Sequence, residues 1–160
     1  MSSSRQIHHV DTSKGDVDML LLIIGGLLVV IVLMGFSMKK GSKAEVSYQY
    51  YTAEKTRAAI ENKEDLILLD IQIEEQWKAG HIKGALPTHA YPVKTTEDKV
   101  KLDNILPELA GRQPIVVVCP GGGSGATRTI DYLKSKGIAA TRLFILENGQ
   151  SKWPYDELIE

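Results

Sequence analysis

The sequence contains a single cysteine, Cys119, among its 160 residues. One cysteine excludes an internal disulfide and any zinc site built from several cysteines, which leaves this residue as either an inert part of the core or a reactive group. The four histidines stand at positions 8, 9, 81 and 89, without the spacing of metal ligands. We therefore expect no bound metal.

The chain also lacks an excess of charge of either sign, because 19 lysine and arginine residues nearly balance 20 aspartate and glutamate residues. No basic stripe with interleaved aromatic residues is present, so nucleic acid is not an expected partner. The length leaves room for one compact domain with appendages, since single domains cluster at about 100 to 150 residues.

One long stretch has no charge at all. The 20 residues from Met19 to Met38 are apolar or small, and about 20 such residues cross the ~30 Å hydrocarbon core of a bilayer. A secretory signal would have a shorter apolar run and a basic start, whereas Asp16 and Asp18 precede this one. The pattern predicts a retained transmembrane helix, and thus four parts: a polar tail (1–18), the helix (19–38), a basic linker (39–45) and a folded domain (46–160).

Basic residues flank the predicted helix unequally. Lys39, Lys40 and Lys43 follow it at once, against Arg5 and Lys14 before it. The positive-inside rule then predicts a single-pass protein of the inner or plasma membrane with its domain in the cytoplasm. The lysines either contact anionic lipid headgroups or belong to a solvated linker.

Helices and strands are predicted to alternate beyond the linker, which indicates an α/β fold with a parallel sheet. Strand signals are short buried runs, and helix signals are caps and stop residues. The expected strands are Leu66–Leu69 (ending at Asp70), Ile115–Val118 and Thr141–Leu146. The expected helices are Thr52 as N-cap through Asn62, Glu74–Ala79 before Gly80, Leu102–Leu109 despite Pro107, and Thr127–Lys136.

The segment Cys119-Pro-Gly-Gly-Gly-Ser-Gly-Ala126 joins a predicted buried strand to a predicted helix. Glycines permit the positive φ angles that turn successive backbone N–H groups toward one point, and the helix start adds partial positive charge. Such a loop holds an anion and favours a thiolate at its rim, the condition for nucleophilic attack or for carrying a persulfide. The alternative is a merely tight turn.

Two nucleotide-binding motifs are alternatives for the same loop. A P-loop needs a lysine after its last glycine, but Ala126 follows Gly125. A dinucleotide fingerprint is matched by Gly121, Gly123 and Ala126, with Glu147 about 20 residues on. Only 13 residues follow Glu147, too few for the remaining strands of a dinucleotide domain. This alternative stays open but is poorly supported.

Motifs on both sides of the loop resemble the rhodanese family. They are Leu68-Leu69-Asp70, Glu74-Glu75-Gln76-Trp77, Gly80-His81-Ile82-Lys83-Gly84-Ala85, Val116-Val117-Val118-Cys119, and Leu146-Glu147-Asn148-Gly149 with Trp153. The resemblance covers about Val46 to Trp153 and implies a three-layer fold with helices on both faces of a parallel sheet.

The resemblance implies a chemistry for Cys119. In the rhodanese family this cysteine accepts sulfane sulfur from a donor, becomes a persulfide, and passes the sulfur to cyanide, a thiol or a protein. The substrate loop would be formed by Gly121, Gly122, Gly123, Ser124 and Gly125, whose N–H groups would cradle the persulfide. No cofactor is implied.

The sequence also departs from the family pattern. Members that use thiosulfate usually have Arg or Lys in this loop, but residues 120–127 contain no cation. Gln72 stands where Arg is common, and Asn148 where the first of two glycines is common. We therefore expect weak thiosulfate activity, unless Arg128 turns toward the loop. Asp70 and His81 are interpreted as structural residues near the site.

Two functions follow. The first is a membrane-anchored sulfurtransferase or persulfide carrier that uses Cys119. The alternative is a catalytically inactive rhodanese-like accessory subunit of a membrane complex, in which Gly25 and Gly26 let a neighbouring helix approach closely. The expected partners are the lipid bilayer and either a membrane protein or a sulfur donor or acceptor protein.

Overall fold

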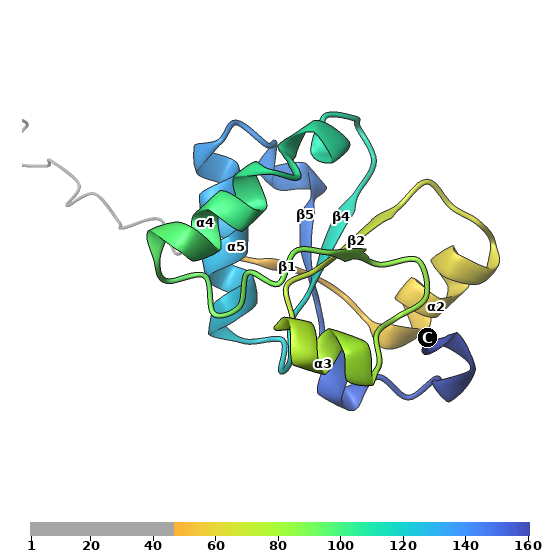
Figure 1. Cartoon of the computed structure of the whole chain (residues 1–160). Helices are drawn as coiled ribbons and strands as arrows, with labels where there is room; N and C mark the ends of the chain where they lie inside the picture. The colour runs from red at the N-terminus through yellow and green to blue at the C-terminus, as the bar shows by residue number, and fades with distance from the viewer. Residues whose placement is uncertain (1–46) are drawn as a thin grey trace, which may run out of the picture. The chain divides into compact units, whose positions relative to one another are not determined.

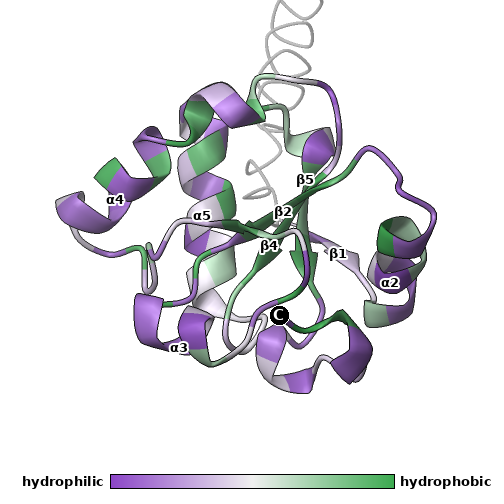
Figure 2. Ribbon diagram, turned by 45° about the vertical axis from the view of Figure 1, so that its right-hand side comes forward, coloured by the Kyte–Doolittle hydropathy of each residue, from purple (hydrophilic) through white to green (hydrophobic). Residues whose placement is uncertain are grey.

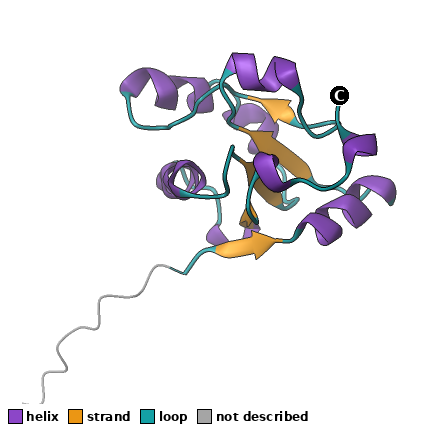
Figure 3. Cartoon of the chain, turned by 90° about the horizontal axis from the view of Figure 1, so that it is seen from below, coloured by secondary structure: helices purple, strands orange, loops and turns teal. Residues whose placement is uncertain are grey.

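A five-stranded parallel sheet forms the centre of the structure, a computed structural model that describes residues 47–160 (Figure 1; Figure 3). The strand order is β1-β5-β4-β2-β3, and every neighbouring pair is parallel. The strands are β1 (Gln49–Tyr51), β2 (Ile67–Asp70), β3 (Leu86–Pro87), β4 (Ile115–Val118) and β5 (Leu143–Leu146). The α/β class and the parallel sheet predicted from the sequence are confirmed.

The predicted tail, membrane helix and basic linker lie outside the described residues. Within residues 47–160, no helix has the length and apolar character needed to cross a membrane.

The register of the sheet brings the carboxyl ends of three strands to one edge. Asp70 at the end of β2 is opposite Val118 at the end of β4, and Val117 is opposite Ile145 of β5. Cys119 therefore begins its loop beside Asp70, at the edge where ligands of parallel α/β sheets bind.

Two apolar clusters cover the two faces of the sheet, because side chains of a strand alternate between faces. Val117 and Cys119 belong to the cluster under α5 (Ser124–Ser135), and Val116 and Val118 to the cluster under α2 (Ala53–Glu61). Figure 2 shows apolar strands inside and polar outer faces on the helices. The predicted arrangement of a sheet flanked by helices is thus observed.

Local signals placed two helices correctly. The Oγ1 atom of Thr52 accepts a hydrogen bond from the N–H of Lys55 at 3.2 Å, and α2 ends at its C-cap, Asn62. The helix α3 (Glu74–Ala79) ends at Gly80 as predicted, where φ is +154°.

The helix predicted over Leu102–Leu109 is wrong. The chain instead forms α4 (Thr96–Asp103) and then a 3-10 helix, η1 (Leu106–Leu109). A capping box between Thr95 and Asp98 starts α4 earlier than predicted. Proline is disfavoured in the interior of an α-helix, so α4 ends before Pro107. Pro107 instead lies in the first turn of η1, where proline is tolerated.

Smaller differences concern the starts of one helix and one strand, and the two edge strands. The helix α5 begins at Ser124 rather than Thr127. The strand β5 begins at Leu143 because the 3-10 helix η2 (Ala140–Arg142) precedes it. The edge strands β1 and β3 were not predicted, since runs of three and two residues carry too little periodicity to be recognised.

Candidate functional site

Cys119 is the first residue after β4, and its burial follows from the alternation of that strand. Its side chain points to the α5 face, where it joins the apolar cluster with Ile71 and Ala126. Only 1% of the residue is exposed. Its backbone carbonyl oxygen accepts a hydrogen bond from the N–H of Gln150 at 2.9 Å, which ties the loop after β4 to the loop after β5.

The loop after Cys119 lies directly on the turn formed by Asn148 and Gly149. A Cβ atom at Gly122, where φ is +65°, would come within 2.7 Å of the backbone nitrogen of Asn148. A Cβ atom at Gly149, where φ is +63°, would overlap the carbonyl oxygen of Cys119 and the nitrogen of Gly122. Asn148 itself has φ +61°, a left-handed conformation that glycine adopts most readily and asparagine more readily than most other residues. Glycine at 122 and 149 is therefore required by close backbone approach.

The glycine loop presents unused hydrogen-bond donors. The backbone N–H groups of Gly121, Gly122 and Gly123 donate to no acceptor within residues 47–160. Gly123 is the N-cap of α5 and supplies no side-chain bond, so the first N–H groups of the helix lack that partner as well. These donors and the positive end of α5 can stabilise a negative charge at the loop.

Gly125 packs against the aromatic side chain of Tyr91, which was not identified as a site residue from the sequence. A Cβ atom there would lie 2.8 Å from Cε2 of the Tyr91 ring and 3.4 Å from Cδ1 of Ile71. Tyr91 is held in turn by a hydrogen bond from its N–H to the carbonyl oxygen of Ile71 at 2.7 Å. The ring thus closes the side of the loop where α5 begins.

Arg128 is bound away from the loop. Its Nε atom donates a hydrogen bond to the carbonyl oxygen of Pro92 at 2.8 Å, and its side chain lines a cavity with Val93 and Lys94. The cavity that the loop residue Pro120 lines is a different one. The structure therefore does not bring Arg128 together with the other predicted loop residues.

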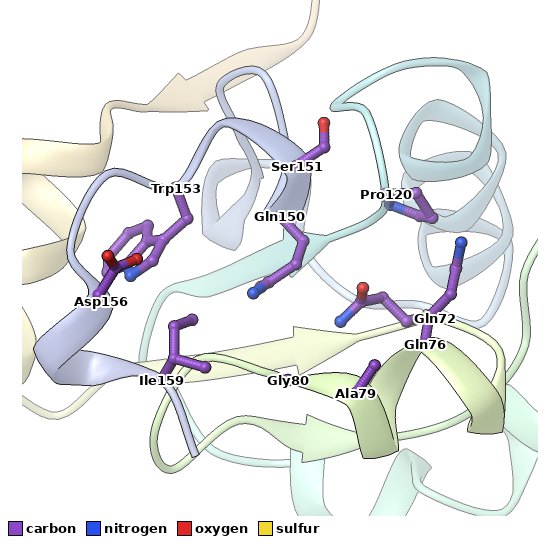
Figure 4. A pocket seen from close by; sticks show the side chains of 10 residues that line it. All are labelled: Gln72, Gln76, Ala79, Gly80, Pro120, Gln150, Ser151, Trp153, Asp156 and Ile159. Carbon is purple, nitrogen blue, oxygen red and sulfur yellow. The ribbon is translucent and has the colours of Figure 1, made fainter.

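A cavity of about 410 Å³ lies beside the loop, as Figure 4 shows. It is lined by three glutamines, one carboxylate and no cation. The lining residues are Gln72, Gln76, Ala79, Gly80, Pro120, Gln150, Ser151, Trp153, Asp156 and Ile159. None of these was predicted as a cavity residue from the sequence, because they come from segments far apart in the chain and share no spacing; Gln72 was noted only as a departure from the family pattern.

Gln150 contributes an unusual polar atom to this cavity. Its Oε1 atom is buried and has no hydrogen-bond partner within the described residues. A buried acceptor without a partner is costly. Gln150 therefore lines the cavity while one of its own polar atoms stays unpaired in the interior of the described domain.

Asp70 and Gln72 form a buried pair below this cavity. The Oδ1 atom of Asp70 accepts from the N–H of Gln72 at 2.7 Å, and Oδ2 accepts from its Nε2 at 2.9 Å. Burial raises the pKa of the Asp70 carboxyl above its ordinary value of 3.8, against the opposing effect of these two bonds. Both carboxylate oxygens of Asp70 accept hydrogen bonds from Gln72, so Asp70 has a structural role.

His81 is part of a contact between α3 and the C-terminus. Its ring stacks on Trp77 with ring centroids 3.4 Å apart, and its Nδ1 lies 3.1 Å from the carbonyl oxygen of Trp77. Its Nε2 is 3.8 Å from Oε1 of Glu160. These contacts engage both ring nitrogens. Within residues 47–160, no three His, Cys, Asp or Glu side chains gather where a metal could bind.

The comparisons with known proteins decide the family. A model of the rhodanese-like domain matches residues 52–155. The chain belongs to the rhodanese-like domain family. A comparison with curated proteins found no match. The family assignment favours a rhodanese loop at Cys119 over the dinucleotide motif.

Solved structures share the rhodanese-like fold with this chain. The BH2092 protein of Bacillus halodurans is 23% identical, with a TM-score of 0.54 over 72% of this chain and 77% of that one. The rhodanese-like domain of Alr3790 from Anabaena sp. is 21% identical, with a TM-score of 0.52 over 67% and 74%. The As-Sb reductase of Leishmania major is 18% identical, with a TM-score of 0.53 over 71% and 85%. Identities this low show the fold alone.

Proposed function

We propose that the protein is a membrane-anchored sulfurtransferase or persulfide carrier that uses Cys119. One observation carries the proposal: in a rhodanese-like domain, Cys119 begins a loop in which the N–H groups of Gly121, Gly122 and Gly123 have no acceptor in residues 47–160. These free donors support the proposal, because backbone N–H groups of such a loop can stabilise the negative charge of a persulfide.

The proposed reaction has two balanced steps. The Cys119 thiolate attacks the outer sulfur of a donor persulfide, R–S–SH. The S–S bond of the donor breaks, R–S⁻ leaves with the electron pair, and Cys119–S–SH forms. An acceptor thiolate then takes the same sulfur and releases the Cys119 thiolate. No oxidant or cofactor is needed.

The charges around the loop support a persulfide rather than thiosulfate as the donor. Thiosulfate is a dianion, yet the cavity beside the loop has no cation, and Arg128 is bound to Pro92. A charge-assisted hydrogen bond contributes about 1.5 to 3 kcal/mol, so its absence weakens anion binding about tenfold to over a hundredfold. Persulfides on small thiols or on proteins do not depend on such a cation.

The burial of Cys119 sets a condition for the reaction. With 1% of the residue exposed, a donor reaches the sulfur only when the residues that cover it move aside. The glycines of the loop make this movement feasible, because they have few steric barriers to rotation. A donor can bind in the neighbouring cavity, which Gln72, Gln76 and Gln150 line with polar side chains.

The membrane anchor is proposed from the sequence. The uncharged segment Met19–Met38 has the length of a bilayer span, and the lysines after it favour a domain on the cytoplasmic side of the inner or plasma membrane. The anchor would hold Cys119 close to a membrane-bound donor or acceptor.

A second function is an accessory subunit without catalysis. It is favoured by the same burial of Cys119 and by the lack of a cation in the neighbouring cavity. In that role the domain would bind a membrane protein. Co-purification of a partner in mild detergent, together with the absence of sulfur transfer, would support it.

The test is sulfur uptake by the full chain in neutral detergent. After incubation with a low-molecular-weight persulfide, we expect a mass gain of one sulfur atom that a reductant removes. Cys119→Ser is a clean control because the chain has no other cysteine. If Cys119→Ser gains the same mass as the native chain, or neither gains any, sulfur transfer by Cys119 is ruled out.

A further inference from the structure

A second cavity, of about 340 Å³, lies between α4 and α5 and shares no residue with the cavity beside Cys119. Lys99 comes from α4, and Arg128 comes from α5. The full lining is Val93, Lys94, Lys99, Arg128, Asp131 and Tyr132. Nothing in the proposed sulfur chemistry uses these residues.

The lining has more positive than negative charge. Lys94, Lys99 and Arg128 form no salt bridge within residues 47–160. The one carboxylate, Asp131, already has partners: its Oδ2 accepts from the Tyr48 hydroxyl at 2.8 Å, and its Oδ1 is 3.7 Å from Nζ of Lys134. Three cations without a carboxylate partner around one cavity favour an anionic ligand.

Arg128 is positioned to contact such a ligand. The bond from its Nε to the Pro92 carbonyl fixes the guanidinium and leaves the two terminal nitrogens as donors. A fixed guanidinium matches the oxygens of a phosphate with two parallel hydrogen bonds. Arg128 therefore provides the oriented donor, and the two lysines add mobile charge.

The remaining walls of the cavity are apolar. Val93 is 2% exposed. The Tyr132 hydroxyl donates to Oδ1 of Asp103 at 2.8 Å, while its ring centroid is 5.9 Å from Nζ of Lys99. The cavity thus has a polar rim and an apolar wall. Its volume is large enough for a phosphate that carries a small organic group.

We propose that this cavity binds a phosphate-bearing anion. The three cations and Asp131 give the lining a net charge of +2, which matches the charge of about −2 on a phosphate monoester. The ligand is either a lipid headgroup or a soluble phosphate ester. A lipid is a candidate source because the predicted anchor ends ten residues before Tyr48, whose hydroxyl donates to Asp131.

The test measures acetylation of Lys94 and Lys99 by mass spectrometry. In one arm the full chain is kept in neutral detergent with and without inorganic phosphate or glycerol phosphate. In the other arm it is inserted in nanodiscs of neutral phospholipid, with and without an anionic phospholipid. Lys63 and Lys83 are the internal controls, since both line another cavity, of about 160 Å³.

We expect Lys94 and Lys99 to be protected in at least one arm while Lys63 and Lys83 are not. Protection in detergent assigns a soluble phosphate, and protection only by the anionic lipid assigns a headgroup. Arg128→Gln should weaken the binding of the protecting ligand about tenfold or more. The double variant Lys94→Gln/Lys99→Gln should abolish anion-dependent stabilisation against heat, unlike Lys63→Gln/Lys83→Gln. The proposal is overturned if neither arm shows protection of Lys94 and Lys99. It is also overturned if Lys63→Gln/Lys83→Gln loses the anion-dependent stabilisation to the same extent as Lys94→Gln/Lys99→Gln.

Discussion

The side-chain amide of Gln72 donates a hydrogen bond to Oδ2 of Asp70 at 2.9 Å, beside the bond from the Gln72 backbone N–H to Oδ1 at 2.7 Å. Gln72 is 4% exposed and Asp70 is fully buried. The carboxylate therefore has amide donors but no cation as a hydrogen-bond partner. Since Gln72 occupies a position where the family commonly has arginine, a neutral amide stands beside Asp70 in place of a cation.

This pair predicts an unusual dependence of stability on pH. Burial raises the pKa of Asp70 above its ordinary value of 3.8. The folded state thus binds the proton more tightly than the unfolded state, so the stabilisation from protonated Asp70 is present below 3.8 and is lost as the pH rises through the folded pKa. Asp70→Asn should become progressively more stable relative to the native chain over that range.

The measurement for Asp70 is urea unfolding of both proteins from below pH 3.8 to neutral pH. Taking the difference between Asp70→Asn and the native chain removes the contributions of the other carboxyl groups, which both proteins share. A difference that does not change with pH would show that the pKa of Asp70 is the same in both states.

Adding a cation to the loop should increase thiosulfate activity. Ser124 is exposed at the start of α5, next to the glycines. In Ser124→Arg, we expect the KM for thiosulfate to fall about tenfold or more, through a charge-assisted hydrogen bond to the anion. Cyanide-dependent thiocyanate formation is the assay. Ser135→Arg adds the same side chain at the other end of α5 and should leave the KM unchanged.

Gly125→Ala should destabilise the fold by about 1 to 3 kcal/mol, as overpacking does in other cores. The added methyl would meet the Tyr91 ring at 2.8 Å. Gly121→Ala is the matched control, because Gly121 lies in the same loop, is not a helix cap, and its Cβ would meet nothing within 4 Å. Urea denaturation of the two variants measures the difference. Equal stabilities would mean that Tyr91 does not close the loop in solution.

The capping box of α4 should contribute about 1 kcal/mol to the free energy of unfolding. Although burial opposes it, hydrogen bonds from the N–H groups of Lys94 and Thr95 lower the pKa of Asp98. This stabilisation is present above the ordinary pKa of 3.8 and is lost as the pH falls through the folded pKa. Asp98→Ala should therefore lower the thermal midpoint at neutral pH, with a smaller effect in acid.

Glu97→Ala provides the control for Asp98. Glu97 is exposed in the same first turn of α4, so its replacement changes the charge without removing the capping box. An equal loss of stability in the two variants at neutral pH would assign the effect to the helix dipole rather than to the cap.

The sequence by itself determined α2, the central strand β4 and the position of the cysteine. Thr52 starts α2 because its hydroxyl caps the helix, and the β-branched run Ile115–Val118 is too apolar to lie anywhere but in a buried strand. Cys119 then begins a loop because a glycine cluster follows the run. These are interactions between near neighbours, so they can be predicted without the fold.

Only the tertiary structure decided what surrounds the cysteine. Gln72 and Gln150 are 78 positions apart, yet they line one cavity because parallel pairing brings the ends of β2, β4 and β5 to the same edge. Arg128 turns to Pro92, which lies 36 positions before it. Side-chain directions and contacts at such separations depend on packing rather than on periodicity, and here they leave the loop of Cys119 with backbone donors but no cation.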